Sequence, residues 1–396
     1  MQKLLLLGAE AIAQGAIDGG ISGVYAYPGT PSTEITEYIQ ADELAKERAI
    51  HSKWSSNEKT AMEAALGMSY AGKRAMVCMK HVGLNVAADA FVNSAITGVN
   101  GGLVVTVADD PSMHSSQNEQ DSRFYGKFAM MPILEPSNQQ EAYEMTHMAF
   151  ELSEQFGLPV LMRITTRLSH SRSTILRKEL KEQNKVSLPS DPKQFVLLPS
   201  IAKGRYKGLI NKQLAMEIAS DDSKFNSYTD AKDKSLGIVA CGISFNYLKE
   251  NYTDSEIPYP VVKISQYPLP RKKIEKLMSE CDEVLVLEDG YPFVEEMLKG
   301  YLAKEKVKGR LDGTLPRDGE LNPNHVGKAL GFEQPKTEET PQIVTGRPPA
   351  MCVGCGHIDA YIALNEAIAE YGAGRVFADI GCYTLGALEP YNAINS

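Results

Sequence analysis

Residues 1 to about 180 alternate short apolar runs with segments of helical periodicity, and this alternation constrains the fold more than any other feature. Strands that are apolar along their whole length and separated by helices are typical of a parallel sheet with both faces covered. The sequence therefore predicts an α/β fold. The expected strands are 23–27, 75–79, 102–107 and 159–163, and the expected helices are 10–20, 32–48, 58–72, 86–97 and 138–156.

A second alternation of the same kind follows a stretch that is rich in Lys, Ser, Pro and Asp. Its expected strands are 236–240, 261–264 and 283–288, and its expected helices lie near 243–252, 269–279 and 291–303. A third pattern consists of a helix at 357–371 and a strand at 375–378. These patterns predict four parts, namely an α/β domain at 1–175, a linker at 176–233, a second α/β domain at 234–330, and a linker with the start of another domain at 331–396.

Composition and charge exclude several classes of protein. The 396 residues are 43% hydrophobic and carry a net charge of −9, so no basic excess is present to neutralise nucleic-acid phosphates. No apolar run approaches the roughly 18 residues of a membrane span, and the apolar run at residues 4–7 is expected to be a strand that enters a turn. Six cysteines are too few for a disulfide scaffold. We expect a cytoplasmic protein with neither nucleic acid nor membrane as a partner.

Glu58 begins the expected helix 58–72, which is rich in alanine and other small residues that pack closely. A carboxylate at the mouth of such a helix is costly to bury unless it is paired or used. In the structural interpretation, the acid stabilises the positive end of the helix dipole. In the functional interpretation, the acid is placed for chemistry. This segment alone leaves both interpretations open.

The turn at 27–33 joins an expected strand to an expected helix. Pro28 and Pro31 flank Gly29 and Thr30 and restrict the backbone of the turn. A simple capped turn between a strand and a helix accounts for this pattern. An anion site accounts for it equally well, because the Thr30 hydroxyl and the N-terminal amides of the helix would meet a carboxylate or a phosphate.

Two further turns carry polar side chains after expected strands. In the turn at 80–85, Gly83 permits close approach of the backbone, and His81 and Asn85 offer polar contacts. The longer loop at 109–123 is dense in hydrogen-bonding side chains. A solvated surface also accounts for each turn. Because the carboxyl ends of parallel strands meet at one edge of the sheet, we expect the turns to form the walls of one pocket.

Cys352, Cys355 and Cys382 form a second chemical pattern. A Cys-x-x-Cys pair suits zinc, a redox dithiol or an iron–sulfur cluster, because two thiolates can then hold one centre. Zinc needs a fourth ligand, and His357 is only two residues from Cys355, which is a cramped spacing for one tetrahedral site. A four-iron cluster with a ligand supplied from elsewhere fits at least as well, so the kind of centre stays open.

Taken together, these segments resemble the alpha subunits of indolepyruvate:ferredoxin oxidoreductases, a family of thiamine diphosphate enzymes that oxidise aryl 2-oxo acids. The resemblance covers essentially the whole chain. Two of its segments, 80–89 and 114–123, are highly specific. The densest segments are 57–59, 80–89, 109–123, 352–357 and 379–386.

The resemblance implies a fold and a chemistry. The fold is a parallel-sheet pyrimidine-binding domain, a second domain like the C-terminal domain of transketolase, and the incomplete start of a pyrophosphate-binding domain. The activity is oxidative decarboxylation of an aryl 2-oxo acid to an acyl-coenzyme A, with electrons passed to ferredoxin. The implied cofactors are thiamine diphosphate with Mg²⁺ and a [4Fe-4S] cluster, and coenzyme A is a co-substrate. The implied partners are the beta subunit of the same enzyme, ferredoxin and further copies of the chain.

The resemblance also assigns roles to single residues. Glu58 matches the glutamate that hydrogen-bonds the aminopyrimidine ring of the cofactor and drives loss of the thiazolium proton. Thr30 matches the threonine that holds the substrate carboxylate in related enzymes. The other assignments are substrate binding by Arg123, cofactor binding by Pro28, Gly29, His81, Gly83, Asn85 and Asn118, and metal binding by Cys352, Cys355 and Cys382.

Family members continue through a full pyrophosphate domain and a cysteine-rich tail, whereas this sequence ends at Ser396. We therefore expect a truncated form that binds thiamine diphosphate weakly and lacks full activity. Two other functions are compatible with the residues. One is a non-redox thiamine diphosphate decarboxylase or synthase, which shares the glutamate and the fold but needs no cluster. The other is a non-catalytic assembly domain.

Overall fold

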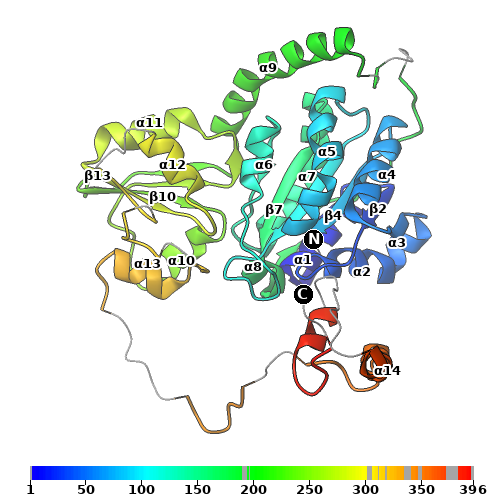
Figure 1. Cartoon of the computed structure of the whole chain (residues 1–396). Helices are drawn as coiled ribbons and strands as arrows, with labels where there is room; N and C mark the ends of the chain where they lie inside the picture. Colours follow the sequence, from blue (N-terminus) through cyan, green and yellow to red (C-terminus); the bar gives the residue numbers. More distant parts are fainter. Residues whose placement is uncertain are drawn as a thin grey trace. The chain divides into compact units, whose positions relative to one another are not determined.

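The computed structural model of the chain describes residues 2–189, 194, 195, 197–300, 306–310, 312–316, 319–333, 340–346, 350–371 and 382–393 (Figure 1). The chain forms two compact units, Met1–Gln334 and Pro335–Ser396. The first unit, called unit 1 below, contains two large sheets and most of the helices. Within the described residues, no helix has both the length and the apolar character needed to cross a lipid bilayer.

A seven-stranded sheet forms the core of the first part of unit 1. Neighbouring strands are parallel except for the antiparallel pair β12 and β6. Strands β4 and β5 are buried along their whole length, as expected for strands covered on both faces. The order across the sheet is β12 (Gln266–Tyr267), β6 (Ile133–Leu134), β7 (Val160–Thr165), β5 (Leu103–Asp109), β4 (Ala75–Lys80), β2 (Gly23–Ala26) and β3 (His51–Trp54).

Helices cover both faces of this sheet (Figure 1). On one side α4 packs against α5, and on the other α1 packs against α7 and α2. Asparagine side chains start two of these helices, since Asn57 accepts a hydrogen bond from the Thr60 amide and Asn138 accepts one from the Glu141 amide. The helices are α1 (Gly8–Asp18), α2 (Thr33–Ala41), α3 (Glu43–Glu47), α4 (Glu58–Tyr70), α5 (His81–Thr97), α6 (Arg123–Phe128), α7 (Gln139–Phe156) and α8 (Thr166–His170).

The second part of unit 1 is a five-stranded sheet with its own helices. Its strands are parallel except for β9, which lies antiparallel to β11. The long helix α9 (Pro199–Asp221) precedes it and packs against α5, α11 and β12. The strand order is β14 (Val307–Lys308), β13 (Glu283–Leu287), β10 (Leu236–Cys241), β11 (Val261–Ile264) and β9 (Ser227–Thr229), and the helices are α10 (Ser244–Glu250), α11 (Arg271–Glu280), α12 (Phe293–Lys299) and α13 (Pro323–Ala329).

Four further elements complete the description of the described residues. In unit 1, β1 (Lys3–Leu7) pairs with β8 (Arg172–Leu176) in an antiparallel two-stranded sheet. This pairing is consistent with the strand expected at residues 4–7. In the second unit, α14 (Gly356–Tyr371) is the expected helix, and a 3-10 helix spans Cys382–Ala387.

The two large sheets are joined by backbone and by buried charge. Strand β12 follows β11 of the second sheet directly, yet it pairs with β6 of the first. Arg163 of β7 is fully buried and its Nε lies 2.6 Å from Asp109 at the end of β5. The same guanidinium pairs with Glu135 and donates to the backbone carbonyl of Asp289, which follows β13, at 2.7 Å. One arginine therefore connects both sheets.

The α/β class with parallel sheets is confirmed, and several element boundaries differ from expectation. The helix expected at 32–48 is two helices, because Asp42 adopts an extended backbone and its side chain caps α3. The helix expected at 86–97 begins five residues earlier, at His81. The expected linker 176–233 contains α9 and β9. The strand expected at 375–378 lies outside the described residues, and the domain boundaries stay predictions.

Replacing Arg163 with Leu is expected to lower the free energy of unfolding by about 3–5 kcal/mol, because the buried Asp109 would lose its closest cation and Glu135 would keep only Arg123, 3.7 Å away. Arg172→Leu is the matched control, since Arg172 is exposed on β8. Urea unfolding followed by circular dichroism measures both. Equal, small changes in the two variants would show that the buried pair does not stabilise the fold.

Asp289 makes the stability of unit 1 depend on pH. Burial raises the pKa of this carboxyl from an ordinary 3.8 to about 6. Its Oδ1 accepts a hydrogen bond from the Leu321 amide at 3.1 Å, and its Oδ2 has no hydrogen-bond partner among the described residues. The folded protein thus binds the carboxyl proton of Asp289 more tightly than the unfolded chain does. The contribution of Asp289 to stability must therefore fall as pH rises from 3.8 to about 6.

Replacing Asp289 with Asn should remove this dependence, because the amide keeps the oxygen that bonds Leu321 and carries no charge. Relative to the wild type, the variant should gain on the order of 2–3 kcal/mol as pH rises through this window. Above about pH 6, the difference in the free energy of unfolding between the variant and the wild type should be constant. Urea titrations at several pH values provide the measurement, and a gap that does not change with pH would contradict the prediction.

Candidate functional site

The carboxyl ends of β2, β3, β4 and β5 lie at one edge of the seven-stranded sheet. Strand β3 pairs with one side of β2, and β4 pairs with the other, so the direction in which the chain adds strands reverses at β2. In α/β sheets, ligands bind in the crevice outside such a reversal. The segments that begin here are the turn after β2, helix α4 after β3, helix α5 after β4 and the loop 110–122 after β5. We call them the strand-end group.

Glu58 is the first residue of α4 and only 9% of its surface is exposed. Its side chain lies against the backbone of Gly83, in the first turn of α5. A Cβ atom added at Gly83 would lie 2.5 Å from both Cγ and Oε1 of Glu58. A side chain at position 83 would therefore displace the Glu58 carboxyl group from this contact. The carboxyl group lies where two helices begin, and helix N-termini favour negative charge.

The segment 80–85, expected to be a turn, is the end of β4 followed by the start of α5. His81 is buried, and its Nε2 lies 3.1 Å from the backbone oxygen of Asn118. Because a carbonyl only accepts, Nε2 carries the hydrogen of this bond, and Nδ1 is the other, buried ring nitrogen. Nδ1 has no partner among the described residues. Asn85 is exposed, and its side-chain oxygen accepts a hydrogen bond from the Tyr125 hydroxyl at 2.6 Å.

The turn after β2 lies beside Lys80. A Cβ atom added at Gly29 would lie 3.2 Å from the Cβ of Lys80. Within the turn, the Gly29 amide donates to the Thr33 hydroxyl at 2.9 Å. Thr30 and Pro28 are exposed, and the Ser115 hydroxyl lies 3.4 Å from the Thr30 carbonyl oxygen. The structure thus brings the turn, the end of β4 and the 110–122 loop together.

Lys80 and Asp110 were missed in the sequence, although they organise this edge. Lys80 Nζ donates to the carbonyl oxygen of Ser115 at 2.6 Å, and burial lowers the pKa of Lys80 despite the nearby Asp110. Burial would raise the pKa of Asp110, but hydrogen bonds from Ser116, Thr166 and the Ser115 amide outweigh it and hold the pKa low. A lysine at the end of an apolar buried strand is the sequence signal that could have revealed the pair.

Arg123 was expected to bind substrate, and that assignment stays a prediction. Its guanidinium is fully buried. It pairs with Asp121, lies 3.0 Å from Glu288 and donates to the Tyr291 carbonyl oxygen at 3.1 Å. Its charge is therefore used inside the protein, at the junction of the two sheets.

Cys352, Cys355 and Cys382 do not come together as the ligands of one metal ion in the described part of the chain. Among the described residues, no three His, Cys, Asp or Glu side chains lie close enough to hold one metal ion. Cys352 and Cys382 are exposed, and Cys355 Sγ lies 3.1 Å from Nδ1 of His357. The assignment of these cysteines to a metal centre stays a prediction.

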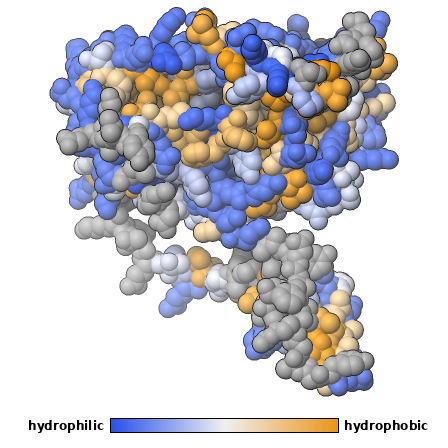
Figure 2. All heavy atoms as spheres, turned by 45° about the horizontal axis from the view of Figure 1, so that its top comes forward, coloured by the Kyte–Doolittle hydropathy of each residue, from blue (hydrophilic) through white to orange (hydrophobic). Residues whose placement is uncertain are grey.

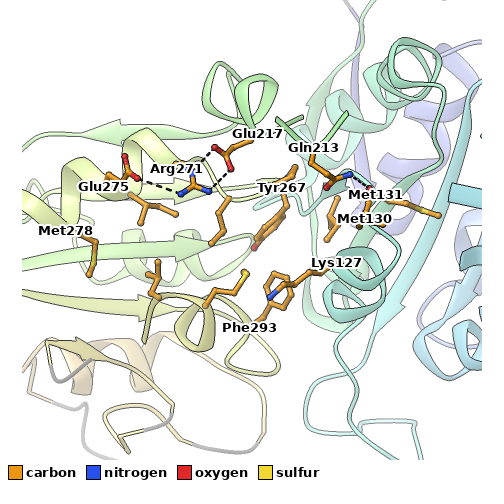
Figure 3. A pocket seen from close by; sticks show the side chains of 16 residues that line it. Lys127, Met130, Met131, Gln213, Glu217, Tyr267, Arg271, Glu275, Met278 and Phe293 are labelled. Carbon is orange, nitrogen blue, oxygen red and sulfur yellow. Dashed lines mark hydrogen bonds and ion pairs between the residues drawn. The ribbon is translucent and has the colours of Figure 1, made fainter. Parts of the chain in front are cut away.

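A cavity of about 670 Å³ lies elsewhere in unit 1, between α6, α9, α11 and α12 (Figure 3). Its lining includes four methionines and Phe293. Arg271 at its rim is already paired with Glu217 at 2.8 Å. None of the strand-end residues lines this cavity, so it is distinct from the candidate site.

Comparisons with known proteins place the chain among thiamine diphosphate proteins. Residues 14–228 match the family model described as pyruvate flavodoxin/ferredoxin oxidoreductase, thiamine diphosphate-binding. The chain is 40% identical to indolepyruvate oxidoreductase subunit IorA of Archaeoglobus fulgidus, over 100% of the chain and 66% of the relative. It is also 40% identical to the subunit of that name from Methanothermobacter thermautotrophicus, over 99% of the chain and 65% of the relative. The chain thus spans slightly less than two thirds of the length of these relatives.

A solved structure supports the fold. The 2-oxoglutarate:ferredoxin oxidoreductase from Magnetococcus marinus, solved with 2-oxoglutarate, coenzyme A and succinyl-CoA bound, superposes with a TM-score of 0.65 and 18% sequence identity. The match covers 78% of this chain and 61% of that chain. The family model covers more than half of the 396 residues and includes Glu58, Gly83 and the whole strand-end group. The chain therefore belongs to the thiamine diphosphate-binding family of pyruvate flavodoxin/ferredoxin oxidoreductases.

Proposed function

We propose that this chain provides the aminopyrimidine side of a thiamine diphosphate site in an oxidoreductase that decarboxylates aryl 2-oxo acids. Coenzyme A would accept the acyl group, and ferredoxin would accept the electrons. The observation that carries the proposal is the Glu58 carboxyl group, held against the Gly83 backbone at the strand reversal. The indolepyruvate oxidoreductase relatives support the choice of substrate class.

The strand-end residues fit one half of the cofactor. Glu58 offers a carboxyl group, Gly83 lets that side chain lie against the backbone of α5, and His81 offers a buried ring nitrogen without a partner among the described residues. These groups suit the aminopyrimidine ring, because its nitrogens and its amino group can form hydrogen bonds with them. When bound, thiamine diphosphate supplies a nucleophilic carbon and a sink for the electrons of the broken carbon–carbon bond.

In this proposal Glu58 exchanges a proton with a nitrogen of the aminopyrimidine ring. Its position supports that role, because Asn57 caps the first turn of α4 and the Glu58 side chain lies against the backbone at Gly83. A carboxyl group placed by two packed helices keeps its orientation between turnovers, which is what general acid–base catalysis requires.

The turn after β2 would receive the substrate carboxylate. The Thr30 hydroxyl is exposed at this turn, and the Cβ and Cδ atoms of Lys80 lie beside Gly29. The Lys80 Nζ is bound to Ser115 and lies near Asp110, so the exposed Thr30 hydroxyl is the group that this turn offers to a carboxylate. Pro28, Asn85 and Asn118 are exposed along the same edge and would line the entrance.

The proposal that electrons pass to ferredoxin is supported by the family membership of the chain and not by the geometry of the strand-end group. The described cysteines do not form a metal-sized group, so no step is assigned to them. We propose that Mg²⁺ and the diphosphate are held by residues outside the strand-end group. We also propose that a beta subunit and ferredoxin complete the electron path, in keeping with relatives that are named as subunits.

Replacing Glu58 with Gln is expected to slow exchange of the thiazolium C2 proton by roughly 10²- to 10⁴-fold, because an amide cannot take up or release the proton. NMR of thiamine diphosphate in D₂O measures this exchange with Mg²⁺, the chain and its partner subunit. The control is Glu63→Gln, an exposed acid of the same helix. Wild-type exchange in the Glu58 variant would remove the catalytic interpretation and favour an assembly role.

Replacing Gly83 with Ala should have nearly the same effect, because the added methyl group needs the space occupied by the Glu58 carboxyl. Gly67→Ala in α4 is the matched control, since a Cβ there would meet no atom within 4 Å. That control should exchange normally and gain about 0.5–1 kcal/mol of stability. Normal exchange in the Gly83 variant would show that Glu58 does not depend on this contact.

A further inference from the structure

The cavity between α6, α9, α11 and α12 has the size and lining of a site for a small organic molecule. Its volume of about 670 Å³ lies in the range of ligand sites, which are mostly apolar and carry a few polar groups. Figure 2, in which the top of Figure 1 comes forward, shows apolar residues in orange among blue ones on the face that carries α9 and α11. The buried apolar residues of the lining are Met131, Ile133, Tyr267, Ile274 and Phe293.

Polar contacts between the walls keep this cavity from closing. Gln213 of α9 donates a hydrogen bond to the carbonyl oxygen of Met130, which follows α6, at 3.2 Å. Arg271 of α11 donates two hydrogen bonds to Glu217 of α9, at 2.8 and 3.1 Å. Helix α9 is thus tied to both sides of the cavity, so the fold itself sets the distance between the walls.

The apolar part of the lining favours an aromatic ring. Four methionines line the cavity, and their flexible, polarisable thioethers make favourable contacts with the edges of aromatic rings. Phe293 and Tyr267 already contact each other edge to face, with ring centroids 5.9 Å apart and planes at 73°. A flat ring placed between the methionines and Phe293 would extend this aromatic cluster. A saturated chain would be buried equally well but would not gain these contacts.

One cation of the lining has no acidic partner in the described part of the chain. Arg271 is paired with Glu217, and Glu275 lies 3.9 Å from the same guanidinium. The Lys127 ammonium forms no ion pair or hydrogen bond with the described residues, and it lies over the Phe293 ring, 5.8 Å from the centroid. Figure 3 shows Lys127 beside Phe293 and apart from the acids around Arg271. A negative group on a ligand ring at Phe293 would therefore meet Lys127.

We propose that this cavity binds an aromatic molecule with one negative group, such as an aryl carboxylate. The ring lies against Phe293 and the methionines, and the negative group pairs with Lys127. None of the lining residues belongs to the strand-end group, so this site is separate from the one proposed for the cofactor. The proposal can therefore be tested without thiamine diphosphate or a partner subunit.

Isothermal titration calorimetry of the full 396-residue chain with 2-naphthoate tests the proposal. One molecule should bind per chain. It should bind more tightly than 2-naphthamide, which has the same ring without the charge, and more tightly than octanoate, which has the charge without the ring. Failure of 2-naphthoate to bind would overturn the proposal, and so would tighter binding of either of the other two compounds.

Replacing Lys127 with Gln isolates the charge. The affinity for 2-naphthoate should fall roughly two- to fivefold, as is typical of an exposed ion pair, and the affinity for 2-naphthamide should not change. Lys249→Gln is the matched control, because Lys249 is also exposed and lies 5.8 Å from the centroid of the Phe245 ring, outside the cavity lining. Equal effects of the two variants on 2-naphthoate would contradict the role of Lys127.

Replacing Met297 with Trp locates the ligand. The larger side chain should fill the cavity and abolish binding of both naphthyl compounds, since Met297 lines the cavity from α12. A melting temperature near that of the wild type, measured by circular dichroism, shows that the variant is folded. A folded variant that still binds 2-naphthoate would place the ligand elsewhere in the chain and would overturn the proposal.

Discussion

The buried ion pairs of Arg163 are the interactions on which the interior of unit 1 depends. Its single guanidinium pairs with acids from β5 and from the end of β6, and it also bonds the backbone that follows β13. Placing such a group in the interior costs several kcal/mol unless its charge and all its donors are matched. The matching acids come from separate segments, so those segments must reach the same point together. The charge therefore specifies how the two sheets are arranged, beyond what apolar packing alone would require.

The same requirement extends to the candidate site. Asp109, which pairs with Arg163, is followed directly by Asp110, whose hydrogen bonds organise the 110–122 loop. That loop supplies Ser115 to Lys80 and the backbone oxygen of Asn118 to His81. A buried charge cluster and an exposed pocket edge thus share one strand end. A change in the buried charge cluster would therefore affect the polar groups of the site through Asp109 and Asp110, which are consecutive in the chain.

The elements with strong local patterns could be predicted from the sequence, and those created by tertiary contacts could not. The buried strands β4 and β5 are apolar throughout, and α7 has a clear cap and period, so their positions follow from local rules. Strand β3 has the polar sequence His51–Trp54 and is mostly exposed, which leaves no apolar pattern to detect. The two-residue β12 exists only because the chain crosses from one sheet to the other.

The candidate site shows the same division. Glu58, Gly83 and Gly29 could be selected from their motifs, but the contact between Glu58 and Gly83 joins segments on different helices. The burial of Arg123 could not be predicted, because an arginine in a polar loop gives no sign that three acids will enclose it.

Glu320, beyond the second sheet, accepts hydrogen bonds from His114 of the 110–122 loop and from Arg167 of α8. The second sheet has no side chain in the strand-end group, yet this acid holds one side of the loop that borders it. Changes in length or sequence around position 320 would therefore move one side of the 110–122 loop without altering any residue of the strand-end group. The arrangement of this edge is thus set in part by a segment about 200 residues away in the sequence.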